Sequence, residues 1–241
     1  MSGVILFDLY NTLLTDETYC FENGLRLLYE TYFESVCTWE DFSGYSAQMW
    51  GMYDEKRKQN IELMLIRDEV PLFFKKFGVT MDVNPEELDY RMMCQMEKET
   101  LWQETEQTLK KLYESDFNMY IVSNSIHIAS SNQKLVESFG IMKYFKKLYC
   151  SADFGWRKPD IRFFDYVVKE VLEENPNLAR EEIFFVGNDY KSDVTGAVNA
   201  GLKPVWYNWE TRSDGSFREN TEKYDLTEIR KFSELLEIVN R

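Results

Sequence analysis

Four short segments of the chain carry side chains that can act together on an anionic substrate. They hold Asp8, Ser123 with Asn124, Lys158, and the acidic pair Asp189 and Asp193. A carboxylate can attack phosphorus and form a covalent intermediate, a lysine supplies fixed positive charge, and hydroxyl and backbone N–H groups donate to phosphoryl oxygens. Grouped carboxylates are also ligands suited to Mg²⁺. These residue types predict phosphoryl chemistry through an aspartyl phosphate at a site that holds Mg²⁺.

Apolar runs predict the elements that position these side chains. Buried strands are expected at 4–7, 119–122, 147–150, 183–186 and 204–207. Helices are expected at 103–113, 128–139, 161–173 and 192–200, with a last one at 226–239. This alternation predicts an α/β fold with a doubly wound parallel sheet and helices on both faces. Ligands bind at the carboxyl ends of such strands, so Asp8, Ser123 and Asp189 are expected at one edge.

The region from residue 15 to 104 has a different character. It is polar, with apolar residues at helical spacing, and four or so helices fit it. A connection of this length cannot be a loop in a compact domain. The sequence therefore predicts an all-helical cap at 15–104, inserted into a core formed by 1–14 and 105–241.

Composition excludes several classes of partner. The net charge is -14 and no cluster of basic residues stands out, so neither a nucleic acid nor an anionic membrane surface is the expected partner. No apolar run has the length of a membrane span or a signal peptide. The four cysteines are far apart without a CxxC pair, which indicates reduced thiols in a cytoplasmic protein. The expected partner is a small phosphorylated molecule, and nothing in the sequence indicates an oligomeric state.

Four motifs make the chain resemble the haloacid dehalogenase (HAD) superfamily of hydrolases. In family order they are Asp8-Leu-Tyr-Asn-Thr12, Ser123-Asn124, Lys158-Pro-Asp160 and Gly187-Asn-Asp-Tyr-Lys-Ser-Asp-Val-Thr-Gly-Ala197. The resemblance implies a Rossmann-like core, in many members with a helical cap after the first motif. It implies that Asp8 is the nucleophile and that Ser123 and Lys158 contact the phosphate. Further site candidates by motif position are Tyr10, Asn11, Thr12 and Asn124 for the substrate, and Asp8, the Tyr10 carbonyl, Asp189 and Asp193 for the metal.

Tyr10 departs from the pattern of the family's phosphatases. Those enzymes usually have Asp at this position as general acid and base, whereas an unperturbed Tyr titrates near pH 10 and is a poor proton shuttle at neutral pH. The superfamily's 2-haloacid dehalogenases do have Tyr there, followed by Gly-Thr, and work without metal; here Asn11 replaces that Gly. Those dehalogenases have an arginine in the cap shortly after a Leu-Trp pair. The comparable place in this sequence reads Met49-Trp50-Gly51, without that arginine. Asn188 stands where many phosphatases have Asp, which leaves open whether Asn188 or Asp189 faces the metal.

The leading hypothesis is therefore a Mg²⁺-dependent phosphatase of a small phosphate monoester. Two alternatives are a metal-independent 2-haloacid dehalogenase and a phosphate-binding module with little turnover. Some of the candidates also have purely structural interpretations. Asp193 can join the first turn of a helix, Asn124 can hold backbone, and Asp160 can cap a helix. For His127, the chain's only histidine, we expect a solvated loop position rather than a place in the site.

Overall fold

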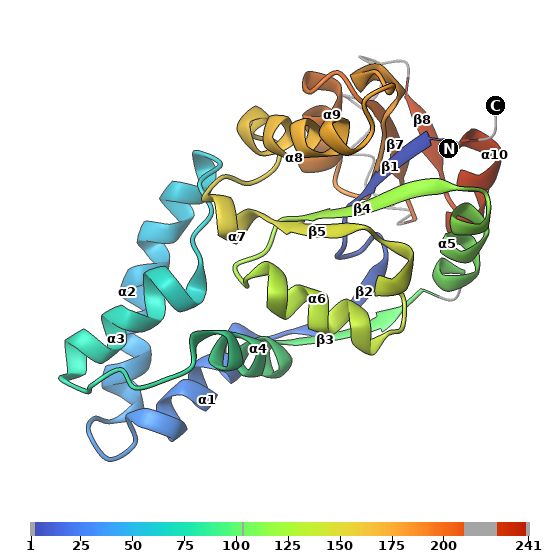
Figure 1. Ribbon diagram of the computed structural model, residues 1–241. Helices are drawn as coiled ribbons and strands as arrows, with labels where there is room; N and C mark the ends of the chain where they lie inside the picture. Colours follow the sequence, from blue (N-terminus) through green and yellow to red (C-terminus); the bar gives the residue numbers. More distant parts are fainter. Residues whose placement is uncertain (1–2, 103, 210–225, 240–241) are drawn as a thin grey trace.

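The core of the protein is a six-stranded parallel sheet. The computed structural model describes residues 3–102, 104–209 and 226–239. The strands lie in the order β5-β4-β1-β6-β7-β8 and every neighbouring pair is parallel (Figure 1). Their bounds are β1 Gly3–Phe7, β4 Phe117–Ser123, β5 Lys147–Cys150, β6 Phe184–Gly187, β7 Lys203–Tyr207 and β8 Thr227–Ile229. The predicted parallel α/β fold is confirmed.

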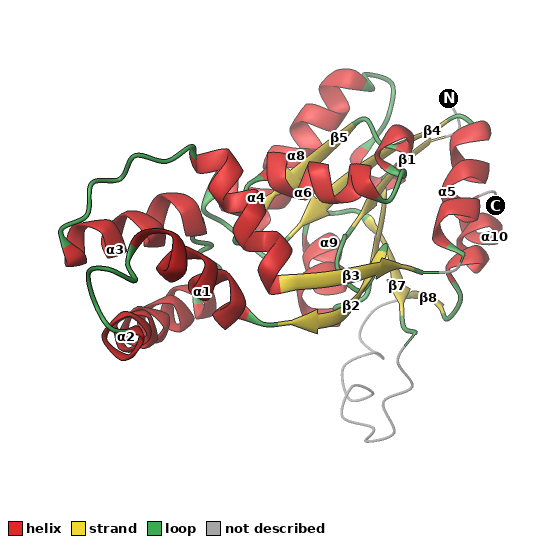
Figure 2. Ribbon diagram, turned by 90° about the horizontal axis from the view of Figure 1, so that it is seen from below, coloured by secondary structure: helices red, strands yellow, loops and turns green. Residues whose placement is uncertain are grey.

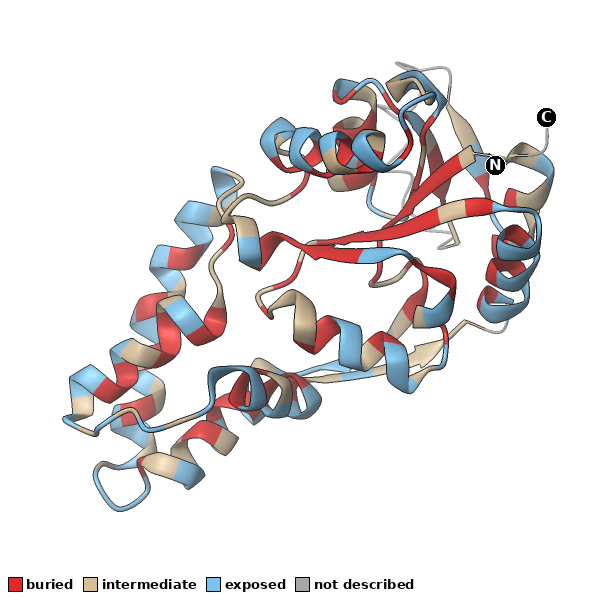
Figure 3. Cartoon of the chain, in the orientation of Figure 1, coloured by how far each residue is buried: buried red, intermediate tan, exposed pale blue. Residues whose placement is uncertain are grey.

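Both faces of the sheet are buried, which explains why its strands are apolar at consecutive positions. In β1, Ile5 and Phe7 join one core cluster while Val4 and Leu6 join the other, because successive side chains of a strand point to opposite faces. The first face is covered by α5 (Thr105–Glu114), α6 (Ala129–Ser138) and α10 (Leu235–Val239). The second is covered by α8 (Ile161–Glu174) and α9 (Thr195–Asn199). The helices turn exposed faces to solvent (Figure 3).

The strand order places the end of β1 at a point where the chain reverses direction across the sheet. From β1 the chain continues to β4 and β5 on one side, then returns to β6, β7 and β8 on the other. In open α/β sheets the crevice at such a point, outside the carboxyl ends of the strands, is where ligands bind. Asp8 is the first residue after β1 and therefore lies at this point.

The inserted region contains four α-helices in the described residues. They are α1 (Phe21–Tyr32), α2 (Trp39–Lys58), α3 (Val70–Phe77) and α4 (Pro85–Met96), with the π-helical turn η1 (Leu65–Glu69) before α3. They have an apolar core of their own, rich in aromatic rings, in which Phe33, Phe42 and Phe73 are fully buried. Asn84 caps α4 by accepting from the N–H groups of Glu86 and Glu87, as the Asn-Pro-Glu-Glu sequence suggests.

A two-stranded antiparallel ribbon connects these helices to the core, and the sequence did not predict it. It consists of β2 (Leu14–Tyr19) and β3 (Glu97–Leu101), paired from Leu14 with Leu101 to Tyr19 with Glu97. Figure 2 shows the ribbon running beside the core toward α1 and α4. β3 is partly exposed and its sequence, Glu-Lys-Glu-Thr-Leu, lacks the apolar run by which the buried strands were recognised.

The C-terminal segment differs from the single helix predicted at 226–239. It begins with β8, continues with a 3-10 turn at Phe232–Glu234, and only Leu235–Val239 is α-helical. The prediction was wrong because Ile229 and Phe232 are buried against the sheet edge next to β7, and this tertiary contact overrides helical spacing.

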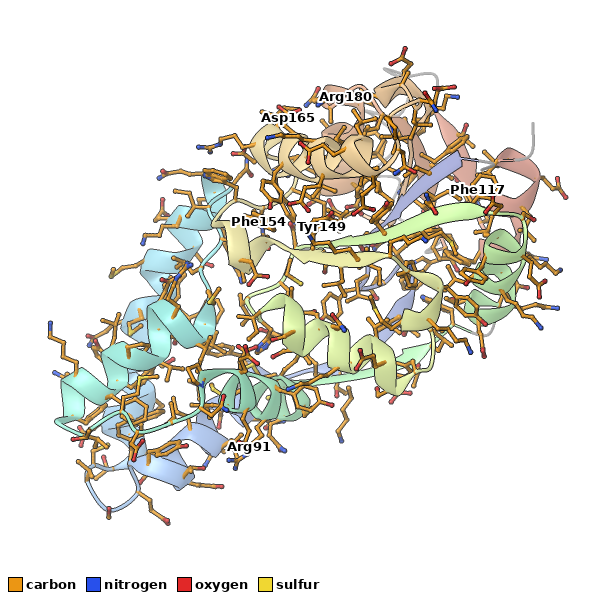
Figure 4. The ribbon with its side chains drawn as sticks, viewed as in Figure 1. Arg91, Phe117, Tyr149, Phe154, Asp165 and Arg180 are labelled. Atoms are coloured by element: carbon orange, nitrogen blue, oxygen red, sulfur yellow. The ribbon has the colours of Figure 1, made fainter. Side chains whose placement is uncertain are left out.

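Several helices carry exposed charged residues on their outer surface. Arg180, in the turn before β6, donates to Asp165 of α8 at 2.7 Å, while Arg91 is exposed on α4 (Figure 4). Within the described parts of the chain, no helix combines the length and apolar character needed to cross a membrane.

Candidate active site

Asp8 is held rigidly at the carboxyl end of β1. Its backbone N–H donates to Val186 O at 2.9 Å, which extends the ladder between β1 and β6 by one residue. Its Oδ1 accepts from Lys158 Nζ at 2.6 Å and its Oδ2 from the Thr12 hydroxyl at 3.0 Å. Asp8 is 7% exposed, so the carboxylate is oriented by two donors and a small part of the residue stays accessible. Each oxygen keeps a lone pair for attack or for a cation.

Lys158 is a buried ammonium that connects three elements. Besides Asp8 it contacts Asp193 Oδ1 at 2.8 Å and donates to Val122 O at 2.8 Å. Burial opposes its charge, but the Asp193 and Asp8 carboxylates outweigh burial and raise the pKa of Lys158 above its usual value. The lysine therefore supplies positive charge beside the Asp8 carboxylate.

Asp193 is buried and faces Lys158. Its Oδ2 accepts from the backbone N–H of Asp189 at 2.9 Å, within the turn that follows β6. Burial raises the pKa of Asp193 to about 7, against the lowering effect of the Lys158 ammonium. The close approach depends on Gly187, because a Cβ at that position would lie 2.4 Å from the Asp193 carboxyl carbon.

The side chain of Asn188 contacts Thr12, whereas the side chain of Asp189 is engaged locally. Asn188 Oδ1 lies 3.3 Å from the Thr12 hydroxyl that also contacts Asp8, while Asp189 accepts from the Ser192 N–H and so caps the turn η4 (Tyr190–Val194). In the portion of the chain that the structure describes, no three His, Cys, Asp or Glu side chains are grouped to hold a metal. The oxygen donors of Asp8 and Asn188 nonetheless suit Mg²⁺, which uses one or two carboxylates and retains waters. The exact ligand set stays a prediction.

Ser123 and Asn124 end β4 beside Lys158. Ser123 is fully buried at the last position of the strand. Asn124 makes two hydrogen bonds to the backbone of Lys158, accepting from its N–H at 2.8 Å and donating to its carbonyl at 3.0 Å. These contacts favour the alternative in which Asn124 holds backbone rather than substrate. Asn124 thereby fixes the loop that carries Lys158. Asp160 likewise caps α8 by accepting from Arg162 N–H.

The Tyr10 hydroxyl is directed to the ribbon and α6. It lies 2.8 Å from Glu97 Oε2 of β3 and 2.8 Å from Asn132 Oδ1 of α6, and its single proton can serve only one of them at a time. Burial, and then the Glu97 and Glu99 carboxylates, raise the pKa of Tyr10 well above its usual value. Tyr10 therefore joins core to ribbon and is unsuited to proton transfer at neutral pH.

Asn11 and Thr12 shape the turn that follows. Asn11 has a φ of 61°, in the left-handed region that asparagine tolerates better than most residues, and its carbonyl accepts from Trp209 Nε1 at 2.8 Å. This backbone geometry explains why asparagine can occupy the position at which the family's dehalogenases have glycine.

His127 is not the solvated loop residue that we expected. It is fully buried, with Nδ1 3.1 Å from Asp89 Oδ1 of α4 and Nε2 3.9 Å from Glu97 Oε1 of β3. The prediction failed because the loop after β4 is covered by the inserted helices, which composition could not reveal. Asp89 also accepts from the N–H of Ile128 at 3.2 Å, so this loop is fastened to α4.

Comparison with known proteins identifies the family. The model of the haloacid dehalogenase-like hydrolase family matches residues 5–207. The chain belongs to this family. It is 26% identical to the HAD-hydrolase YfnB of Bacillus subtilis over 98% of this chain and 94% of the relative. It is 27% identical to the pyrimidine 5'-nucleotidase YjjG of Escherichia coli, over 85% of each chain.

Two solved structures of HAD-like hydrolases bear on the fold. The magnesium-bound structure of YfnB aligns over 99% of both chains with a TM-score of 0.60 and 25% identity. A 2-haloacid dehalogenase from Pseudomonas syringae aligns over 100% of this chain and 99% of the other with a TM-score of 0.69. At 21% identity, the second likeness shows the shared fold alone.

Sequence reasoning missed a set of charged residues where the inserted helices meet this HAD-like core. Glu62 is buried between Arg57 (3.5 Å) and Arg157 (3.3 Å), and it accepts from the Ser151 hydroxyl at 3.0 Å. The backbone also pairs here, from Glu62 N to Gly155 O and from Arg157 N to Asn60 O. Only the position of Arg157 next to Lys158 was a signal in the sequence.

Proposed function

We propose that the protein is a Mg²⁺-dependent phosphatase of small phosphate monoesters that acts through an aspartyl phosphate on Asp8. The observation that carries the proposal is the buried ammonium of Lys158, 2.6 Å from Asp8 at the switch point of the sheet. Positive charge fixed there stabilises a phosphoryl group during transfer. The name of YjjG, a nucleotidase, and the magnesium in the YfnB structure support the proposal.

In the first step, an Asp8 carboxylate oxygen attacks phosphorus and the bond from phosphorus to the ester oxygen breaks. Lys158 and the hydroxyl of Ser123 bind the phosphoryl oxygens, and Thr12 holds the second Asp8 oxygen so that the attacking one is aimed. Asp8 and the Asn188 side-chain oxygen would help to hold Mg²⁺, which when bound would supply further positive charge between the two anions. Asp193 keeps the Lys158 ammonium in place.

In the second step, water attacks phosphorus, phosphate leaves and the Asp8 carboxylate is restored. The ester oxygen that left in the first step takes its proton from water. The Tyr10 hydroxyl cannot supply this proton, because it is engaged with Glu97 or Asn132 and its pKa is raised. A missing general acid costs about 10²–10⁴-fold in rate for poor leaving groups. We infer a slow or selective phosphatase that favours acidic leaving groups.

The helices of residues 21–96 select the leaving group in this proposal. They contact the loop after β4 directly, with Leu65 N donating to Ile126 O at 2.9 Å, and so enclose the crevice. The magnesium-bound structure of YfnB reveals interdomain movement in that protein, which supports opening of the corresponding cleft for substrate entry. A cytoplasmic location stays a prediction.

A panel of phosphate esters, tested with and without Mg²⁺ on the wild type and on Asp8→Asn, tests the proposal. We expect Mg²⁺-dependent hydrolysis by the wild type and none by Asp8→Asn. Full activity of Asp8→Asn excludes the covalent mechanism. Release of chloride from 2-chloropropionate without Mg²⁺ identifies a dehalogenase instead, and saturable phosphate binding without any hydrolysis identifies a binding module.

A further inference from the structure

Residues 59–64 connect α2 to η1 and lie against the core loop that leads to α8. We call them the connecting segment. The backbone N–H of Glu62 donates to Gly155 O at 3.1 Å, and the backbone N–H of Arg157 donates to Asn60 O at 2.9 Å. Figure 1 shows the end of α2 beside this loop. The two backbone hydrogen bonds dock the segment on the core without any contribution from the Glu62 side chain.

The Glu62 carboxylate is buried between two cations. Its side chain is 1% exposed, and its oxygens lie 3.3 Å from Arg157 Nη1 and 3.5 Å from Arg57 Nε. Burial lowers the pKa of Arg157, and the carboxylates of Glu62 and Asp189 oppose this effect. Because Asp189 belongs to the turn after β6, the Arg157 guanidinium lies close to the catalytic edge as well as to the connecting segment.

One branch of contacts leads from Glu62 to the phosphate-binding lysine. Arg157 directly precedes Lys158, whose ammonium extends to Asp8 Oδ1 at 2.6 Å and to Val122 O at 2.8 Å. A shift of the Glu62 carboxylate therefore moves Arg157 and, through the shared backbone, Lys158. A misplacement of about 1 Å in a catalytic site can lower the rate about 100-fold.

A second branch leads from Glu62 to the loop that carries Ser123. The hydroxyl of Ser151, directly after β5, donates to Glu62 Oε2 at 3.0 Å and accepts from the backbone N–H of Ser125 at 3.0 Å. Ser151 Oγ also lies 3.2 Å from Ser125 O, but a carboxylate is the stronger acceptor for its single proton. Ser151 is fully buried, and Ser125 follows Ser123 by two residues. This chain of hydrogen bonds fixes the backbone that follows Ser123.

We propose that Glu62 is a positioning residue that aligns Ser123 and Lys158 for the phosphate through these two branches. A contact that served attachment alone could end anywhere on the core, whereas both branches end within two residues of a phosphate contact. Displacement of the inserted helices releases both branches at once, so phosphate binding depends on docking of the connecting segment. The assignment rests on the proposed phosphatase function, because that function makes Ser123 and Lys158 contacts of the phosphate.

The experiment measures binding of inorganic phosphate to the full chain with Mg²⁺ by calorimetry, alongside hydrolysis of p-nitrophenyl phosphate. Glu62→Gln keeps the size of the side chain and removes its charge. All assays run well below the melting temperature of every variant, so that folded proteins are compared. We expect Glu62→Gln to weaken phosphate binding and to lower kcat, each at least ~10-fold, because both contacts lose their alignment. The matched control is Glu55→Gln, since the Glu55 carboxylate pairs with Lys58 on the exposed side of α2; it should behave as the wild type.

A double-mutant cycle separates alignment from stability. Ser151→Ala cuts only the branch to the loop after β4, and we expect it to weaken phosphate binding about threefold in the otherwise wild-type protein. In the Glu62→Gln background the same substitution should change phosphate binding by less than about 1.5-fold, because the charged acceptor of that branch is already lost. A purely structural role of Glu62 predicts equal changes in both backgrounds.

Three results overturn the assignment. A lower melting temperature of Glu62→Gln with wild-type phosphate binding and kcat means that Glu62 only attaches the segment. Equal effects of Ser151→Ala in both backgrounds mean that Glu62 does not act through that branch. A wild type that does not bind phosphate removes the contacts that Glu62 aligns. Phosphate binding that Glu62→Gln weakens, without hydrolysis of any ester, supports the assignment and refutes the phosphatase proposal, so the two failures are distinguishable.

Discussion

Lys158 Nζ lies 2.6 Å from Asp8 Oδ1, although the two residues are 150 positions apart in the chain. The contact forms because β1 and β4 are neighbours in the sheet and Asn124, just after β4, holds the Lys158 backbone from both sides. The contact between Asp8 and Lys158 thus rests on the sheet and on the loop that Asn124 holds.

Replacement of Lys158 by Met should abolish turnover and destabilise the fold. The variant leaves Asp8 and Asp193 buried without their cation, and breaking such a pair costs about 3–5 kcal/mol. We expect kcat to fall at least ~100-fold, in line with loss of electrostatic stabilisation. Hydrolysis of p-nitrophenyl phosphate with Mg²⁺ and urea unfolding measure the two effects. Lys203→Met, at an exposed lysine, is the control; equal activity of the two variants contradicts the role of Lys158.

Gly187→Ala should disturb the site through Asp193 alone. The added methyl would overlap the Asp193 carboxyl and displace it from Lys158, so we expect a loss of kcat of roughly 10-fold or more through weakened charge stabilisation. The matched control is Gly51→Ala, in the middle of α2, where a Cβ meets no atom within 4 Å. That variant should gain about 0.5–1 kcal/mol of stability and keep full activity. Wild-type kinetics in Gly187→Ala would show that Asp193 does not matter.

Tyr10→Asp tests whether only the general acid is missing. We expect its turnover to rise for alkyl phosphates such as sugar phosphates, and much less for p-nitrophenyl phosphate, whose acidic leaving group needs no proton. Tyr10→Phe should keep activity within about threefold and lose about 1–3 kcal/mol of stability, since Glu97 loses a donor. A loss of turnover on both substrates in Tyr10→Asp would assign Tyr10 an essential role of its own.

Glu69 should make the fold less stable as pH rises. Its pKa is raised to about 8 in the folded state, above the unfolded value of 4.5, so the folded state holds a proton that the unfolded state releases between these values. Stability therefore falls with pH across this window, by about 3 kcal/mol at pH 7. Glu69→Gln has no such proton and should flatten the dependence and melt higher at pH 7. Parallel pH profiles of the melting temperature in both proteins would refute this.

Five strands of the sheet and the place of Asp8 at a strand end were predictable because each rests on a local signal. Val4 to Phe7 is apolar at every position since both faces of β1 are covered, and Asp8 interrupts that run where the strand ends. The motif residues Ser123 and Lys158 follow the same logic. Because parallel strands have their carboxyl ends at the same edge of a sheet, the positions of the strand ends were enough to predict that these residues lie at one edge.

The contacts between core and inserted helices were not predictable from single residues. His127 is buried by Asp89, the Tyr10 hydroxyl is held by Glu97, and Glu62 lies between two arginines only after the chain has folded. Such long-range pairs leave no periodic pattern in the sequence. The ribbon at Leu14–Tyr19 and Glu97–Leu101 was missed for a related reason, because β3 is partly exposed and neither strand shows an apolar run.

The most direct test of the account is detection of the phosphoryl group on Asp8. The wild type, mixed with p-nitrophenyl phosphate and Mg²⁺ and quenched with acid during turnover, is digested and its peptides are weighed by mass spectrometry. We predict a phosphorylated N-terminal peptide with the modification at Asp8, absent without substrate and absent in Asp8→Asn. Steady turnover with no phosphoryl group on Asp8, or with the group on another residue, would contradict the central claim.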